Sequence, residues 1–128
     1  YLANKYKSKK VDFIGSVRNE EVWDIILNSR AVVTATKLFE GQPTLLCEAS
    51  LLEVPAIFPK TGGISEFFPD NYPLSFEQFN YDDLIDKINL VSNEEEMNQI
   101  GKANKKFINE YLSKIKIISL FKEALHEQ

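Results

Sequence analysis

The stretch AVVTATKLFEGQPTLLCEASLLEVPAIF, residues 31–58, decides the fold of this chain. It begins with AVVTAT (31–36) and ends with VPAIF (54–58), two short runs rich in the apolar, β-branched and aromatic residues that favour strands. Between them, residues 43–52 form an apolar segment that begins with Pro43, and proline is common at the first position of a helix. Strand, helix and strand in this order predict a βαβ unit, whose strands are parallel and covered on both faces.

The residues on either side continue this alternation. VDFIG (11–15) is expected to form an earlier strand. YPLSF (72–76) is expected to form a later strand at a sheet edge, because Pro73 has no N–H for a ladder hydrogen bond. Further helices are expected over residues 19–30, 64–68, 80–92, 93–113 and 114–128. The predicted fold class is therefore α/β, a Rossmann-like doubly wound parallel sheet with C-terminal helices.

Two of these helices have a recognisable cap or apolar face. Asn19 is a suitable N-cap for the helix at 19–30. In the helix at 93–113, the residues expected to share the core face are Met97, Ile100, Ala103, Phe107, Ile108 and Tyr111. Trp23, Phe67 and Phe68 are expected to pack in the core or between helices.

The composition limits the classes of function. The chain has 128 residues, the size of one domain, and a net charge of −4, which gives no overall attraction to nucleic acid or anionic membranes. It has no apolar run of the roughly 18 residues that a membrane-spanning helix needs. The single cysteine, Cys47, lies inside a predicted helix and is expected to pack in the core. His126 has no ligand-type neighbours, so no metal site is expected.

Ligands of a doubly wound sheet bind at the carboxyl ends of its strands. Here those ends are residues 15–18, 34–43 and 59–65. The free amides of Thr44 and Leu45, at the start of the following helix, suit a phosphate group because the helix dipole adds to them. Glu48 lies on the same helix face as Thr44, so its carboxylate is placed to accept hydrogen bonds from a vicinal diol such as that of a ribose.

Glu40 lies in the loop before this helix and is placed to accept hydrogen bonds from sugar hydroxyls. A buried and unpaired carboxylate at Glu48 costs about 1–3 kcal/mol or more, so a partner is expected for it. The alternative is that Glu48 is a half-exposed helix residue and Glu40 a solvated loop residue. The segment TGGISE (61–66) also has two interpretations: a second anion site at a helix start, or a plain tight turn.

The segment FEGQPTLLCEAS (39–50) resembles the E-x7-E segment of retaining glycosyltransferases with the GT-B fold, especially family 4, the glycosyl transferases group 1. Three further pieces resemble that family in the same order along the chain: VDFIGSV, VWDIILNSRAVVTAT and VPAIFPKTGGISEFF. The last contains the family's Gly-Gly loop and, after it, an acidic residue, here Glu66. The likeness covers about residues 11–90.

This resemblance implies a role for each residue of the candidate site. Glu48 would bind the ribose of the donor nucleotide, and Glu40 would face the transferred sugar as the catalytic carboxylate. The other implied donor-binding residues are Gly41 and Gln42 along the sugar, Pro43, Thr44 and Leu45 at the diphosphate, and Gly15, Ser16 and Val17 beside the base. The implied substrate is a UDP-, GDP- or ADP-sugar, with no cofactor and no metal. Ala35, Thr36 and Gln42 depart from the family's pattern, which leaves the donor sugar open.

The resemblance also implies how the chain is organised. Residues 1–128 would be part of a C-terminal nucleotide-sugar-binding domain, with a helix end and loop over 1–10, the sheet core over 11–78 and helices over 79–128. The family's basic diphosphate loop and its acceptor-binding half would lie outside this sequence. This piece is therefore expected to be inactive alone. The full-length enzyme is expected to transfer a sugar to a glycan or lipid-linked acceptor in the cytoplasm, with peripheral association at the inner face of the membrane left open.

Three other interpretations stay open. A nucleotide-sugar 2-epimerase shares the fold, but such enzymes need a histidine near the sugar, which this stretch lacks. A receiver-like signalling domain needs paired acidic residues and a phosphorylatable aspartate at a strand end, whereas Asp12 lies inside its predicted strand and residues 31–36 end without an aspartate. The third is a non-catalytic scaffold with the same α/β fold.

Overall fold

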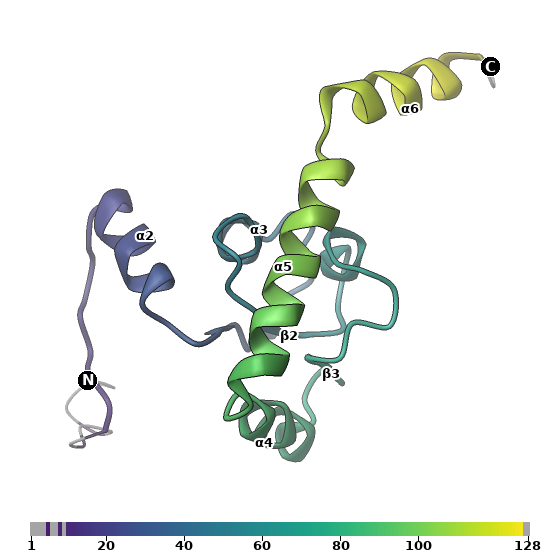
Figure 1. Ribbon diagram of the computed structural model, residues 1–128. Coiled ribbons are helices and arrows are strands. Elements are labelled where there is room, and N and C mark those ends of the chain that lie inside the picture. The colour runs from purple at the N-terminus through teal and green to yellow at the C-terminus, as the bar shows by residue number, and fades with distance from the viewer. Residues whose placement is uncertain (1–4, 6–7, 9, 127–128) are drawn as a thin grey trace.

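Three short parallel strands form the sheet of this chain (Figure 1). In the computed structural model, which describes residues 5, 8 and 10–126, they are β1 (Val32–Val33), β2 (Ala56–Pro59) and β3 (Ser75–Phe76), in the order β1-β2-β3. Val32 pairs with Ala56, and Phe58 pairs with Ser75. The predicted βαβ unit is thereby confirmed, and the predicted edge strand over 72–76 is confirmed only for its last two residues, Ser75 and Phe76.

Helices connect and follow these strands. They are α2 (Asn19–Leu27), α3 (Thr44–Leu51), the 3-10 helix η1 (Ile64–Phe67), α4 (Tyr81–Leu90), α5 (Glu94–Tyr111) and α6 (Lys114–His126). In Figure 1, α5 crosses the centre of the molecule and α6 extends away from its end. A parallel sheet combined with helices confirms the predicted α/β, Rossmann-like fold class.

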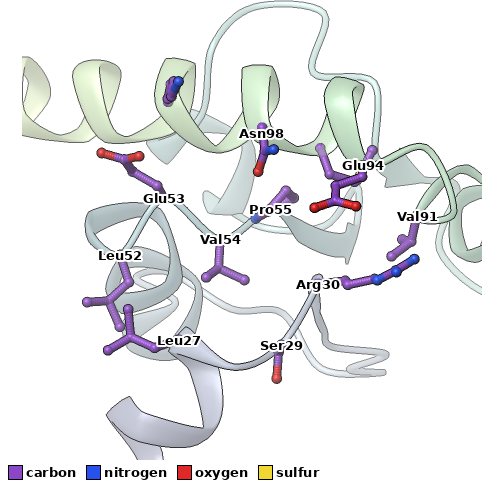
Figure 2. Close-up of a pocket in the computed structure, with 12 residues that line it drawn as sticks. Leu27, Ser29, Arg30, Leu52, Glu53, Val54, Pro55, Val91, Glu94 and Asn98 are labelled. Carbon is purple, nitrogen blue, oxygen red and sulfur yellow. The ribbon is translucent and has the colours of Figure 1, made fainter.

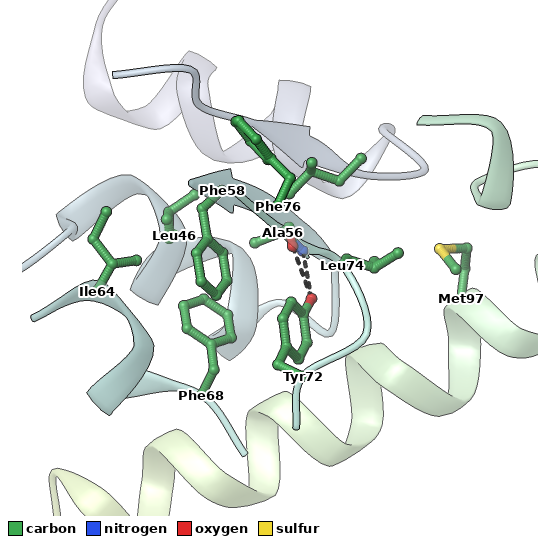
Figure 3. Close-up of a cluster of buried hydrophobic side chains, with 10 residues drawn as sticks. Leu46, Ala56, Phe58, Ile64, Phe68, Tyr72, Leu74, Phe76 and Met97 are labelled. Atoms are coloured by element: carbon green, nitrogen blue, oxygen red, sulfur yellow. Dashed lines mark hydrogen bonds between the residues drawn. The ribbon is translucent and has the colours of Figure 1, made fainter. Parts of the chain in front are cut away.

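The main core lies around β2 and is rich in aromatic rings (Figure 3). The rings of Phe58 and Phe68 lie 4.3 Å apart between centroids, and the ring of Tyr72 stacks on Phe58 at 5.3 Å. Leu46 brings α3 into the same cluster, and Met97 brings α5 into it. Burial of these apolar surfaces stabilises the sheet and the two helices together. Phe68 is therefore a core residue, as predicted.

Helix α5 packs closely on the end of α3. Its buried residues are Met97, Gly101, Asn104 and Ile108. A Cβ atom on Gly101 would overlap the carbonyl oxygen of Glu53, so the backbone of α5 approaches this residue without a side chain between them. The predicted core face was therefore partly wrong: Ala103 is exposed, while Gly101 and Asn104 are buried. Gly101 and Asn104 are buried on the side of α5 that approaches Glu53 and Tyr72, whereas Ala103 lies outside that buried set.

The first predicted strand is wrong. Residues 12–15 have no strand pairing, and Val11 forms only an isolated antiparallel bridge with Ser8. Phe13 and Ile14 are 51% and 59% exposed. A β-strand requires a hydrogen-bonded neighbour, and none of the described residues supplies one beside this segment. The apolar composition of VDFIG is therefore not sufficient to form a strand here.

The predicted details of α2 also need correction. The N-cap is Arg18 rather than Asn19, and Glu21 accepts a hydrogen bond from the Arg18 backbone amide at 3.1 Å. The helix ends at Leu27, three residues before the predicted end. Trp23 is 48% exposed and is not a core residue. The predicted helix end and loop over residues 1–10 lie mostly outside the described residues.

Candidate functional site

The loop that carries Glu40 is held by the turn after β2. The Gly63 amide donates a hydrogen bond to the carbonyl oxygen of Glu40 at 3.0 Å. Gly62 has φ of +56°, and a Cβ atom there would overlap this same carbonyl oxygen. Only glycine combines this backbone angle with so close an approach. Gly62 and Gly63 thus form a turn, before the start of η1, that fixes the backbone at Glu40, a half-buried residue. A second anion site at this helix start stays a prediction.

A second contact holds the start of the same loop. The Gln78 side-chain amide, just after β3, donates to the Thr36 carbonyl at 3.4 Å. The Thr34 hydroxyl, just after β1, is buried and has no hydrogen-bond partner among the described residues. The sequence prediction missed Gln78, although its place just after an expected strand end was the available signal. The carboxyl ends of the three strands therefore meet around the Glu40 loop, as expected for a parallel sheet.

Helix α3 begins immediately after this loop. Pro43 is its N-cap, and the Cys47 amide is the first to bond within the helix, to the Pro43 carbonyl at 3.0 Å. The amides of Thr44 and Leu45 therefore lack partners within the helix, and both residues are exposed, as are Gly41 and Gln42 before them. Free amides and the positive end of the helix dipole form an environment suited to an anion.

Glu48 lies one turn into α3 and is partly buried. Its carboxylate has no hydrogen-bond or ion-pair partner in the described part of the chain, so the structure does not supply the partner expected from the sequence. Glu48 lines a hollow of about 490 Å³ whose other lining residues come from α2: Asn19, Glu20, Trp23, Asp24 and Leu27. A carboxylate without a partner, facing an open hollow, is available to bind a ligand.

Cys47 packs inside the protein next to Glu48. It is only 6% exposed. Burial raises the pKa of the Cys47 thiol, and the negative charge of the neighbouring Glu48 raises it further. A thiol with a raised pKa is protonated at neutral pH and is a poor nucleophile, in agreement with a packing role.

The structure does not bring every predicted site residue to the Glu40 loop. Gly15 and Ser16 are exposed, and Val17 is half-buried. Among the described residues, no hydrogen bond joins any of these three to residues 40–48. Gly15 has φ of +69°, and a Cβ atom on it would meet no heavy atom within 4 Å, so nothing packs against it. Among the described residues, no hydrogen bond thus connects the predicted base-binding segment to α3, and its role stays a prediction.

A separate hollow of about 320 Å³ lies near the amino ends of β1 and β2, whereas the Glu40 loop lies at the carboxyl ends of the strands (Figure 2). Arg30 and Glu94 lie on it beside Pro55, and Lys102 lines it from α5. It contains none of the predicted site residues. Since Arg30 follows α2 while Glu94 and Lys102 both belong to α5, no local pattern in the sequence indicated this hollow.

Metal sites and membrane spans are both absent from the described ranges. Within them, no three or more His, Cys, Asp or Glu side chains group closely enough to hold a metal ion. No helix in the same ranges has the length and apolar character needed to cross a membrane.

Comparison with known protein families identifies a family that matches most of the chain. The family described as glycosyl transferases group 1 matches residues 1–107, a range that includes Glu40, Glu48 and the rest of the candidate site. No curated protein and no solved structure matches the chain significantly.

Proposed function

We propose that this chain, which belongs to the glycosyl transferases group 1 family, binds the nucleotide-sugar donor of a glycosyl transfer reaction. The observation that carries the proposal is Glu48, a partly buried residue whose carboxylate has no hydrogen-bond or ion-pair partner among the described residues. It lies one turn after the free amides at the start of α3. One short helix thus offers an anion site and, next to it, an acceptor for sugar hydroxyls.

The proposed binding mode follows from these groups. The amides of Thr44 and Leu45 would contact the diphosphate, and Glu48 would accept from the two ribose hydroxyls. Breaking the bond between sugar and phosphate develops negative charge on the leaving diphosphate. A preorganised helix terminus stabilises that charge without reorganising during the reaction.

Glu40 is the proposed catalytic carboxylate. Departure of the sugar creates positive charge at its anomeric centre, and a nearby carboxylate stabilises this charge electrostatically. The hydrogen bond from Gly63 to the Glu40 carbonyl supports this role because it fixes the backbone beside the proposed sugar site. Gly41 and Gln42 would contact the sugar from the same loop.

We further propose the stereochemical course, the donor and the acceptor of the complete reaction. As part of a full-length enzyme of the family-4 type, the chain would take part in transfer with retention of the anomeric configuration. The donor would be a UDP-, GDP- or ADP-sugar, and the acceptor a glycan or a lipid-linked glycan. The proposed chemistry uses the helix terminus and the two carboxylates and requires no metal or cofactor.

Ligand-observed NMR with UDP, GDP and ADP tests donor binding. The native chain should bind at least one of the three, and Glu48→Ala should weaken that binding by about ten-fold or more, since a hydrogen bond to a charged group contributes about 1.5–3 kcal/mol. Glu94→Ala is the matched control, because Glu94 is an exposed glutamate at the start of α5 that lines the other hollow. A native chain that binds none of the nucleotides, or a Glu48→Ala variant that binds as well as the native chain, contradicts the proposal.

A further inference from the structure

The turn that follows β3 presents two aromatic rings to solvent. Phe79 is 61% exposed, and Tyr81, the first residue of α4, is 52% exposed. Both line an open hollow of about 560 Å³, whose other lining residues are Gln78, Asn80 and Asp82. Aromatic rings beside a few polar groups are typical of ligand sites, because the rings offer apolar area and the polar groups fix orientation.

The backbone at Phe79 is held in a conformation that phenylalanine rarely adopts. Phe79 has φ of +68°, a value that favours glycine or asparagine in a turn. Two hydrogen bonds hold this turn: the Asn80 amide donates to the Glu77 carbonyl at 2.9 Å, and the Glu77 amide donates to the Asp83 carboxylate at 2.8 Å. A ring that is mostly exposed offsets little of the backbone strain by packing. Because strained residues gather at ligand sites, this angle points to a use of the ring at the surface.

The hollow adjoins the loop that carries Glu40. The Gln78 side-chain amide, from the lining of the hollow, donates to the Thr36 carbonyl at the start of that loop. The turn follows β3 directly, so it lies at the carboxyl ends of the strands, as the Glu40 loop does. The hollow and the proposed sugar position therefore lie at the same edge of the sheet.

We propose that this hollow binds a saccharide unit of a glycan, with the rings of Phe79 and Tyr81 as its contact surface. The inference rests on the proposed function in taking a glycan as the acceptor. A pyranose has a face of C–H groups that packs on an aromatic ring, and a rim of hydroxyl groups that bond to amides, hydroxyls and carboxylates. The unit bound in the hollow lies apart from the transferred sugar, which the proposed function places at Glu40.

The polar groups of the hollow fit a neutral saccharide. The Asp82 carboxylate and the Tyr81 hydroxyl have no hydrogen-bond partner among the described residues, so both are available to saccharide hydroxyls. Asp82 also places a negative charge in the first turn of α4, where it complements the helix dipole and repels a phosphate group. A neutral sugar is therefore favoured here over a nucleotide.

Titration of the isotopically labelled chain with neutral oligosaccharides tests the inference. The probes are maltohexaose, an α-mannohexaose and chitotetraose. Backbone amide shifts locate the contact, and saturation-transfer NMR measures the affinity. At least one probe should shift the amides of residues 77–82, whereas UDP, GDP and ADP, titrated in parallel, should leave these amides unchanged.

Replacement of Phe79 separates the effect of the ring from the effect of the strained backbone. Phe79→Gly removes the ring but suits the positive φ, so the melting temperature should stay the same or rise while saccharide affinity falls about ten-fold or more. Phe79→Tyr keeps an aromatic face and should keep most of the affinity, and Tyr81→Ala should weaken it as Phe79→Gly does. Phe121→Ala is the matched control, since Phe121 is 67% exposed on α6 and outside this hollow.

The outcomes separate this inference from the proposed function. A loss of saccharide affinity in folded Phe79→Gly and Tyr81→Ala, with nucleotide binding unchanged, supports the inference. It is overturned if the native chain binds none of the oligosaccharides, or if Phe79→Gly binds them as well as the native chain does. Nucleotide-induced shifts at residues 77–82 would assign the hollow to nucleotides and overturn it too. Donor binding is measured separately through Glu48→Ala, so it stands or fails independently of these results.

Discussion

One hydroxyl group satisfies both backbone groups of Ala56: the Tyr72 hydroxyl donates to the Ala56 carbonyl at 2.9 Å and accepts from the Ala56 amide at 3.1 Å (Figure 3). On the other side of β2, the Pro55 carbonyl accepts a hydrogen bond from the Val32 amide in β1. The Ile57 carbonyl accepts one from the Thr34 amide, just after β1. Since β3 begins opposite Phe58, the hydroxyl occupies the place where a neighbouring strand has not yet begun. The hydroxyl thereby pairs the amide and the carbonyl of Ala56, the buried first residue of β2, which would otherwise have no hydrogen-bond partner on this side.

Tyr72→Phe should destabilise the fold. The substitution leaves the amide and carbonyl of Ala56 unpaired, and with them the Asn104 side-chain amide, which donates to the same hydroxyl at 3.2 Å. Unpaired buried polar groups cost about 1–3 kcal/mol, so the free energy of unfolding should fall by about that amount. Urea denaturation measures it, with Tyr81→Phe at an exposed position as the control. Equal stability of Tyr72→Phe and the native chain would show that the hydroxyl contributes nothing net.

The same groups predict how stability depends on pH. Burial raises the pKa of Tyr72, although its hydrogen bonds with Asn104 and Ala56 act in the opposite direction, and burial also raises the pKa of Cys47. A group whose pKa is raised on folding contributes stability below its unfolded pKa and loses it as the pH rises through its folded pKa. The free energy of unfolding should therefore fall above about pH 8.5 from Cys47, and further above about pH 10 from Tyr72.

Denaturation curves collected from pH 7 upward test this dependence. Each group contributes at most about 1.4 kcal/mol per pH unit. Cys47→Ala should remove the lower part of the decline, and Tyr72→Phe the upper part. A decline unchanged in both variants would assign the alkaline instability to other groups.

Gly101→Ala should also destabilise the protein, although alanine is favoured over glycine inside a helix by about 1 kcal/mol. The added Cβ atom would overlap the Glu53 carbonyl and push α5 away from the end of α3. Forcing extra atoms into a packed interface costs about 1–3 kcal/mol, so the steric effect should exceed the helix preference. Thermal denaturation measures the result, and Gly41→Ala is the control because nothing lies within 4 Å of the added atom there. A more stable Gly101→Ala would show that the interface adjusts freely.

The sequence predicted the parts of the fold that depend on local composition. The runs at 31–36, 54–58 and 72–76 each overlap an observed strand, because apolar residues bounded by turn signals report burial directly. The run at 11–15 has a similar composition but, among the described residues, no strand partner beyond the isolated bridge between Val11 and Ser8. Strand formation depends on a neighbour distant in the sequence, which composition does not reveal.

Contacts between residues far apart in the sequence explain the other differences between the predicted and the observed structure. Asn104 is buried and its side-chain amide donates a hydrogen bond to the Tyr72 hydroxyl, 32 residues away, whereas a polar residue carries no apolar signal in the sequence. The E-x7-E spacing predicted a site at the start of α3, and both the site and the roles of its residues stay predictions. Neither the hollow between Trp23 and Glu48 nor the contact from Gly62 to Glu40 follows from spacing, since each joins separate elements.

Gly62→Ala tests whether the turn after β2 positions Glu40. The added Cβ atom would overlap the Glu40 carbonyl, and alanine at a φ of +56° costs roughly 1–2 kcal/mol in addition. The loop at 38–42 should therefore shift. If Glu40 faces the sugar as proposed, a nucleotide sugar should lose affinity while the matching nucleoside diphosphate, which contacts α3 and Glu48, keeps it. Ligand-observed NMR with UDP-glucose against UDP, and GDP-mannose against GDP, measures this difference.

Gly63→Ala is the control for this prediction, because its Cβ atom would lie 3.4 Å from the Gly41 carbonyl, at ordinary contact distance, and its backbone amide still bonds to Glu40. Glu40→Gln should reproduce the selective loss without moving the backbone, since an amide keeps the shape of the side chain but not its negative charge. If Gly62→Ala weakens nucleotide and nucleotide sugar equally, the turn supports the whole site rather than Glu40. If Glu40→Gln leaves the preference for the sugar intact, Glu40 does not face the sugar.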